Sequence, residues 1–147
     1  MSDSSGTHLW LVLMKAHRAF ARHAHRSIGR HDIGFTDFTI LEALLHKGPQ
    51  LVNEIGRRIN LTSGATTTAV DRLEEAGLVE RESDDSDRRA RVVTLTRDGR
   101  ALIAKIYEQH KAQMDEAAVG LTHAERETLI RLLKKAGKTA EQKLEPR

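Results

Sequence analysis

Apolar residues recur at spacings of three and four over most of the chain, the period that places them on one face of a helix. The first such stretch predicts a helix at about residues 7–28. Its seam consists of Trp10, Leu13, His17, Phe20 and Ala24. This heptad-like regularity suits packing of one helix on another. The chain is therefore expected to begin with a long helix that has one side to cover.

A pair of shorter helices is predicted next. Thr36 is expected to cap a second helix, because threonine accepts a hydrogen bond from a free N–H of the first turn, and Gly48 with Pro49 ends it. Its apolar side chains are Phe38, Leu41, Leu44 and Leu45. A short third helix follows, with a seam of Leu51, Ile55 and Ile59.

A fourth helix is predicted at about residues 63–76, with Thr62 as its N-cap and Gly77 as its stop signal. The residues expected on its inner face are Ala65, Ala69, Val70 and Leu73. Those expected on its outer face are Gly64, Thr67, Thr68, Asp71 and Glu75. The third and fourth helices, joined by a tight link, predict a helix-turn-helix unit.

Beyond Gly77, two short strands are predicted at residues 78–82 and 91–95, joined by a polar turn at residues 83–90. Thr96 is expected to cap the next long helix. Thr122 and Glu125 have the spacing of a capping box that opens the last helix. The apolar positions of the last helix include Leu129 and Leu133.

The predicted fold is mainly α with a small β-wing. A winged helix-turn-helix over residues 36–96 is flanked by long terminal helices at 7–28 and 97–144, within a single domain of residues 1–147. A chain of this length can bury one compact core. The net charge is +3 and the isoelectric point is about 9.4, a balance that permits nucleic-acid binding.

Several classes of protein are disfavoured. The chain has no cysteine, which excludes disulfides and thiol catalysis. It has no apolar run near the roughly 20 residues of a membrane span and no basic region typical of a signal peptide, so we expect a cytoplasmic protein. No nucleophile with a base, phosphate-binding loop or set of metal ligands is recognisable. We therefore expect no enzyme, no cofactor and no metal site.

Two segments carry a resemblance to a known family: DRLEEAGLVER at residues 71–81 and DRRARVVTLTRDG at residues 87–99. With the helix order of nearly the whole chain, they resemble the MarR family of winged helix-turn-helix regulators. The Asp-x-Arg of the wing, followed by Leu-Thr and Gly, is the most specific part. The resemblance implies a homodimer, a palindromic operator in double-stranded DNA and, in many members, a small ligand that weakens DNA binding.

The outer face at the start of the fourth helix has side chains suited to the major groove. These are Ser63, Gly64, Thr67 and Thr68. Hydroxyls can hydrogen-bond several base edges, and glycine allows close approach of the backbone. Arg57 and Arg58 are candidates for phosphate contacts, although one of them can equally face solvent. The acidic residues of this helix, Asp71, Glu74 and Glu75, are expected to point away from phosphate or to pair with arginine.

The turn between the strands carries the second set of DNA-binding candidates, Asp87, Arg88 and Arg89. An aspartate two residues before Arg89 can orient its guanidinium. An oriented arginine fits the narrow, electronegative minor groove of A·T-rich DNA. The alternative is a solvated hairpin tip with surface ion pairs, which the preceding helix-turn-helix makes the weaker interpretation.

The terminal helices predict a dimer, because a small winged helix cannot bury three long amphipathic helices by itself. A monomeric bundle is the alternative. A two-fold pair also sets two recognition helices about 34 Å apart, as a palindrome requires. A ligand pocket is expected between these helices and the winged helix, with the candidates Trp10, His17, Phe38, Tyr107 and His110. Ordinary core packing is the alternative for these residues, His17 and His110 included.

The sequence thus favours a homodimeric, sequence-specific DNA-binding regulator. We expect a repressor, because the chain has no added domain to contact polymerase, and a small aromatic or phenolic ligand is the family's usual effector. The alternative function is a winged helix used for protein contact without DNA binding. A gel shift at two salt concentrations separates these functions, since binding to phosphates weakens as salt rises.

The wing assignment predicts that Arg89→Ala weakens operator binding by about 1–3 kcal/mol, the usual range for a specific contact. Asp87→Ala should cost less, because it removes orientation rather than contact. The measurement is a DNA-binding titration, with circular dichroism as the control for folding. Unchanged affinity in a well-folded Arg89→Ala protein would contradict the assignment.

Overall fold

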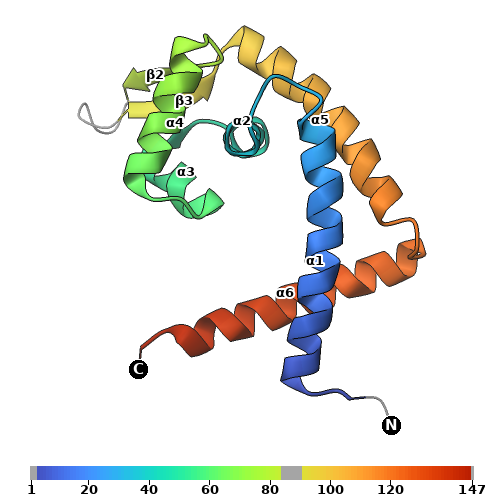
Figure 1. Ribbon diagram of the computed structural model, residues 1–147. Coiled ribbons are helices and arrows are strands. Elements are labelled where there is room, and N and C mark those ends of the chain that lie inside the picture. Colours follow the sequence, from blue (N-terminus) through green and yellow to red (C-terminus); the bar gives the residue numbers. More distant parts are fainter. Residues whose placement is uncertain (1–2, 84–90, 147) are drawn as a thin grey trace.

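The computed structural model describes residues 3–83 and 91–146. Six helices and a three-stranded sheet make up this part of the chain (Figure 1). The elements are α1 Gly6–Ile28, α2 Phe35–Lys47, β1 Gln50–Leu51, α3 Val52–Ile59, α4 Ser63–Glu75, β2 Val79–Ser83, β3 Arg91–Leu95, α5 Arg97–Ala117 and α6 His123–Leu144. The expectation of a mainly helical fold with a small β-wing is confirmed.

The hydrophobic core lies between α2, α3, α4, α5 and the sheet. Its most completely buried side chains include Ile40, Leu41, Leu44, Ile55, Val70, Val93, Ile103 and Ile106. The sheet is antiparallel in the order β1–β3–β2, so β3 is central and its Val93 is fully buried. This core fixes the winged helix as one body and leaves only one side of α4 open to solvent.

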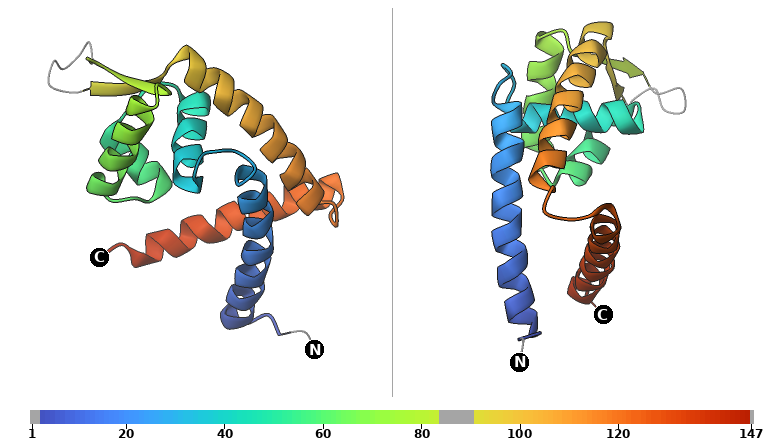
Figure 2. Two further views of the ribbon diagram at one scale, coloured as in Figure 1. Left: turned by 45° about the horizontal axis from the view of Figure 1, so that its top comes forward. Right: turned by 90° about the vertical axis from the view of Figure 1, so that its right-hand side faces the viewer.

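The terminal helices project from that body (Figure 2). Only Ser27 and Ile28, at the end of α1, are buried, and α6 has no buried residue among those the structure describes. Most of the exposed large apolar side chains gather here: Leu9, Trp10, Leu11, Val12, Leu13 and Phe20 on α1, and Leu129, Ile130, Leu132, Leu133 and Leu144 on α6.

Most predicted caps are confirmed. The side chains of Thr62, Thr96 and Thr122 each accept a hydrogen bond from the backbone N–H three residues later, at 3.0–3.2 Å. The predicted cap of α2 is wrong, because Gly34 takes the N-cap position and Thr36 lies inside the first turn. Phe35 thereby begins the helix, and its ring stacks on His25 of α1 with ring centroids 4.5 Å apart.

Two further expectations need correction. Leu51 does not lie inside the third helix: Gln50 and Leu51 form β1 and pair with Val93 and Val92. The two residues complete the sheet, an interaction distant in sequence that a local pattern does not reveal. On α4, Thr66 is buried and Ala65 is exposed, the reverse of the prediction for Ala65. Burial of Thr66 is tolerated because its hydroxyl donates to the carbonyl oxygen of Thr62 at 2.8 Å.

Two glycines permit close contacts that hold the winged helix together. A Cβ at Gly56 would lie 2.8 Å from Thr66 Oγ1, so α3 and α4 approach closely there. A Cβ at Gly99 would overlap the carbonyl oxygen of Leu78, just before β2. That oxygen also accepts a hydrogen bond from the backbone N–H of Thr96 at 3.1 Å. The start of α5 is thereby packed directly on the base of the wing.

Gly99→Ala is expected to destabilise the protein, because backbone on one side and a helix turn on the other leave no room for a methyl group. Overpacking of this kind costs about 1–3 kcal/mol, enough to lower the thermal midpoint by several degrees. The matched control is Gly64→Ala, at an exposed position in the first turn of α4 where no atom lies within 4 Å of the added Cβ. Its midpoint should stay or rise, because alanine is the better helix former. Equal midpoints for both variants would contradict the packing described.

Candidate nucleic-acid interface

The exposed face of α4 begins at its first turn. Ser63, Gly64, Thr67 and Thr68 are all exposed there, as the sequence predicted. The hydroxyl of Thr68 donates to the carbonyl oxygen of Gly64 at 3.0 Å and can still accept a bond. The hydroxyl of Thr67 makes no hydrogen bond within the described ranges, so it can both donate and accept. Together these groups form a polar surface whose hydroxyls can hydrogen-bond base edges.

Asp71 and Glu74 of α4 pair with arginine, one of the two arrangements expected for the acidic residues of this helix. Glu75 is exposed and has no ion pair in the described part of the chain. Arg81 of β2 donates from Nη2 to Asp71 Oδ1 at 2.5 Å and from Nη1 to Glu74 Oε1 at 3.0 Å. The backbone N–H of Arg81 also donates to Glu74 Oε2 at 3.2 Å. Two carboxylates on the outer side of α4 are thus bound by one guanidinium from the wing.

A second ion pair holds α4 from the other side. Arg72 Nη2 donates to Asp37 Oδ1 of α2 at 2.5 Å. The hydrogen bond to Asp37, together with its charge, raises the pKa of Arg72 above its usual high value. Helix α4 is therefore tied to α2 as well as to β2.

The two arginines at the end of α3 are placed differently. Arg57 is exposed and has no ion pair or hydrogen bond in the described part of the chain. Arg58 donates from Nε to Gln50 Oε1 at 3.0 Å. Gln50 is only 4% exposed and donates from Nε2 to the carbonyl oxygen of Ala43 at 3.2 Å. Arg57 thus faces solvent, whereas Arg58 is held against the sheet and the end of α2.

The wing candidates Asp87, Arg88 and Arg89 lie outside the described residues. The strands on either side are well defined, with β2 and β3 paired from Val79 and Leu95 to Ser83 and Arg91. At the opposite end from the termini, β2 and β3 lie beside α4 (Figure 1). The described surface therefore places the exposed face of α4 and the base of the wing at one end of the molecule.

Comparison with known proteins agrees with this geometry. Residues 31–90 match a sequence model described as MarR family. The HTH-type transcriptional regulator MhqR of Bacillus subtilis is 37% identical over 134 residues, which cover 91% of this chain and 92% of that protein.

The chain belongs to the MarR family. It is a DNA-binding transcriptional regulator of this family and not an enzyme.

Solved structures of MarR-type proteins share the fold. A mutant of MarR from E. coli, solved in complex with operator DNA, has a TM-score of 0.77 and 26% identity, covering 92% of this chain and 99% of that one. BpsR of Bordetella bronchiseptica has a TM-score of 0.76 and 25% identity, covering 91% and 94%. Its structure concerns the regulation of DNA binding by 6-hydroxynicotinic acid.

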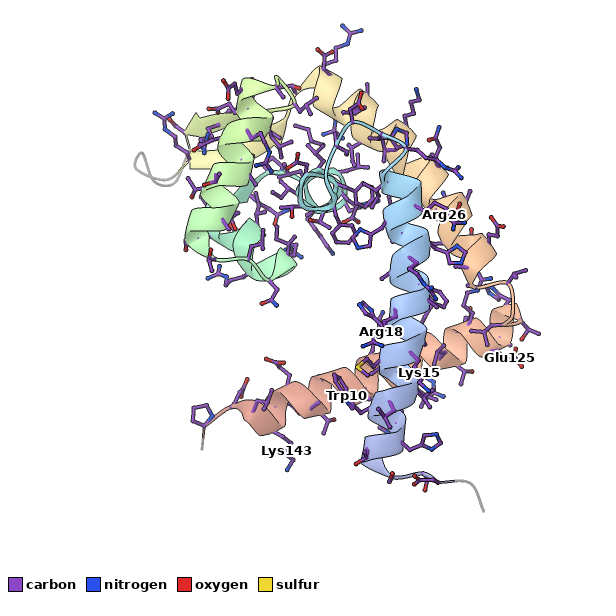
Figure 3. All side chains as sticks on the ribbon, in the orientation of Figure 1. Trp10, Lys15, Arg18, Arg26, Glu125 and Lys143 are labelled. Carbon is purple, nitrogen blue, oxygen red and sulfur yellow. The ribbon has the colours of Figure 1, made fainter. Side chains whose placement is uncertain are left out.

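The five predicted ligand residues do not form one cluster. Phe38 packs on His110 with ring centroids 4.9 Å apart. Tyr107 packs on His46, which sequence reasoning missed, with centroids 4.5 Å apart. Trp10 is 59% exposed and lies in the N-terminal half of α1, far from α2 (Figure 3). His17 lines a cavity of about 400 Å³ between α1, α5 and α6.

A larger cavity, of about 540 Å³, lies along α2 and the end of α3. Its lining mixes apolar and polar side chains: Phe35, Thr36, Thr39, Glu42, Ala43, His46, Lys47, Arg58, Ile59 and Leu61. None of the five predicted ligand residues lines this cavity, but His46, which does, packs on the ring of Tyr107. In residues 3–83 and 91–146, no three His, Asp or Glu side chains are grouped to hold a metal ion, and no helix is long and apolar enough to cross a membrane.

His110 has the least favourable setting for a charge among these rings. Burial against Phe38 lowers the pKa of His110, and the negative charge of Glu42 opposes this effect more weakly. The Nδ1 atom of His110 is buried and has no hydrogen-bond partner in the described residues. Protonation therefore costs more in the folded state than in the unfolded state, so His110 makes the protein less stable as the pH falls below about 6.5.

His110→Phe should accordingly flatten the dependence of stability on pH below about 6.5. The measurement is the thermal midpoint of both proteins over a pH series. Parallel curves for the two proteins would contradict the assigned environment of His110.

Proposed function

We propose that this MarR-type chain acts as a homodimer that represses transcription from a palindromic operator. The observation that carries the proposal is the pairing of two surfaces on one chain. One is the open polar face of α4 beside the wing base, and the other is the uncovered apolar face of α1 and α6. The first suits DNA, and the second needs a partner.

A second copy is the partner that fits these helices best. Apolar side chains on α1 and α6, among them Leu13, Phe20 and Leu133, line the same cavity and stay partly open to solvent. Patches of this extent are rare on monomers that work alone. A closed two-fold pair covers both helices at once and sets the two α4 helices against successive turns of one DNA face.

Base recognition is assigned to Ser63, Gly64, Thr67 and Thr68, and a phosphate contact to Arg57. The wing residues Asp87, Arg88 and Arg89 are assigned to the minor groove. Arg58 is a weaker candidate, because Gln50 holds its Nε. The use of this winged helix for protein contact alone is set aside by membership of a DNA-binding family.

An effector is part of the proposal. Small planar anions or phenols are the ligand class that the aromatic and histidine side chains of α2 and α5 suit, and the cavity beside them adds Lys47 and Arg58. BpsR, whose DNA binding is regulated by 6-hydroxynicotinic acid, supports this class. A ligand acts only through different affinities for two states, and a tenfold loss of DNA affinity needs about 1.4 kcal/mol of coupling.

Selection of bound fragments from genomic DNA tests the proposal. We expect inverted repeats with half-sites about one helical turn apart and binding that weakens with salt. Transcription in vitro from a selected site should fall when the protein is added, and a planar anion or phenol from a panel should restore it. Sites without two-fold symmetry would overturn the palindrome, and increased transcription would overturn repression.

The dimer proposal predicts that Leu133→Asp separates the subunits. An unpaired carboxylate buried in an apolar seam is strongly unfavourable, whereas on the surface of a monomer it costs little. Sedimentation at micromolar concentration should show a wild-type dimer and a variant monomer. Gln142→Asp, with the same charge change on the opposite side of α6, should leave the dimer intact. A well-folded wild-type monomer would contradict the proposal.

A further inference from the structure

Arg81 occupies an unusual place between the recognition helix and the wing. It lies two residues after buried Val79, on the side of β2 that faces α4, and its own side chain is only 16% exposed. Its guanidinium binds Asp71 and Glu74 with separate nitrogens, while its backbone N–H binds the second oxygen of Glu74. All of these contacts join two elements that the proposed function uses for DNA.

The partners of Arg81 make this arrangement more than a local ion pair. Asp71 and Glu74 lie one helical turn apart, and Asp71 follows Thr67 and Thr68 on the same side of α4. Arg81 itself lies two residues before the end of β2 at Ser83, where the wing turn begins. One side chain therefore sets the distance and direction between the helix assigned to the major groove and the strand that carries the wing.

Stability is a poor explanation for this arrangement. Asp71 and Glu74 have side chains that are 62% and 44% exposed. Ion pairs with such open partners contribute little to folding. A planar guanidinium that bonds two fixed acceptors does, however, restrict the geometry of both elements, which a lysine could not do.

We propose that Arg81 is a positioning residue for operator binding: acting through Asp71 and Glu74, it fixes the wing relative to α4. The inference rests on the proposed use of α4 and the wing. It differs from two simpler accounts, in which Arg81 contacts a phosphate itself or only masks two carboxylates that would repel DNA.

Two variants with opposite changes of charge separate these accounts. Arg81→Ala removes one positive charge, and the double variant Asp71→Asn with Glu74→Gln removes two negative charges. A positioning role predicts that each variant loses about tenfold in operator affinity, comparable to the loss of one specific contact. The triple variant should lose about as much as either alone, because all three break the same connection.

Electrostatic accounts predict a different pattern. If Arg81 masks the carboxylates or contacts phosphate, the variant lacking the two carboxylates binds as well as the wild type or better. If Arg81 contacts a phosphate directly, Arg81→Ala would also reduce the slope of log affinity against log salt concentration by about 1, the value of one phosphate contact. Either of these results would overturn the proposal.

A footprint supplies a readout that a general loss of stability would not give. With cleavage in the minor groove by hydroxyl radicals, the variants should lose protection under the wing while keeping the protection centred on α4. Lys111→Ala, which removes one charge from an exposed pair with Glu108 on α5, is the control and should bind like the wild type. Unaltered wing protection in both variants would also overturn the proposal.

The experiment stays decisive if Arg81→Ala fails to fold. The double variant alters only exposed side chains, and circular dichroism with thermal unfolding checks its fold. If the wild type shows no salt-sensitive operator binding, the proposed function itself fails. If the wild type binds with wing protection and both variants bind with the same affinity and the same wing protection as the wild type, only the role of Arg81 fails.

Discussion

Burial of one side of α4 is the constraint on which the rest of the molecule depends. Thr66, Val70 and Leu73 are fixed in the core against α2, α3 and the sheet. Only the opposite side remains for solvent, and the chain places its small polar residues there. The helix cannot rotate to offer another face without exposing those side chains, so core packing fixes which face of α4 stays open to solvent.

The contacts around α4 differ in what they fix. The hydrophobic core sets its depth, and the close approach at Gly56 sets its spacing from α3. Ion pairs set its direction, with Asp37 on one side and Arg81 on the other. The terminal helices α1 and α6 differ from α4: although α1 packs on α5, the exposed apolar side chains of α1 and α6 are not covered by their own chain. The geometry of these two helices in the assembly therefore depends on what covers them.

The sequence predicted most of this fold because helix periodicity and threonine caps are local signals. Thr62, Thr96 and Thr122 need only their own next turn to act. The errors arise where a distant residue decides. The local pattern places Leu51 in a helix seam, but in the structure Leu51 pairs with Val92 in the sheet. It also places Thr36 at a cap, but α2 begins one residue earlier, at Phe35, whose ring packs on His25. Thr66 looks too polar for a core position, yet its hydroxyl bonds back to its own helix.

The candidate site divides in the same way. The exposure of the four site candidates on α4 followed from spacing alone. The different placement of Arg57 and Arg58 depends on Gln50, a residue with no sequence motif. Arg81 stood in the family-like segment, but its partners become visible only when β2 folds against α4. The predicted ligand residues were selected as apolar positions with polar tips, and that criterion cannot tell that Trp10 lies far from α2.

The packing of Gly99 on Leu78 has a mechanical consequence. The carbonyl oxygen of Leu78 binds the N-terminus of α5, and no side chain separates the two backbones. The base of the wing and α5 therefore move as a single stiff body. With its 21 residues, α5 is a lever about 30 Å long that ends near α6. A tilt imposed at the far end of that lever is delivered to the wing as a displacement, without any unfolding between the two.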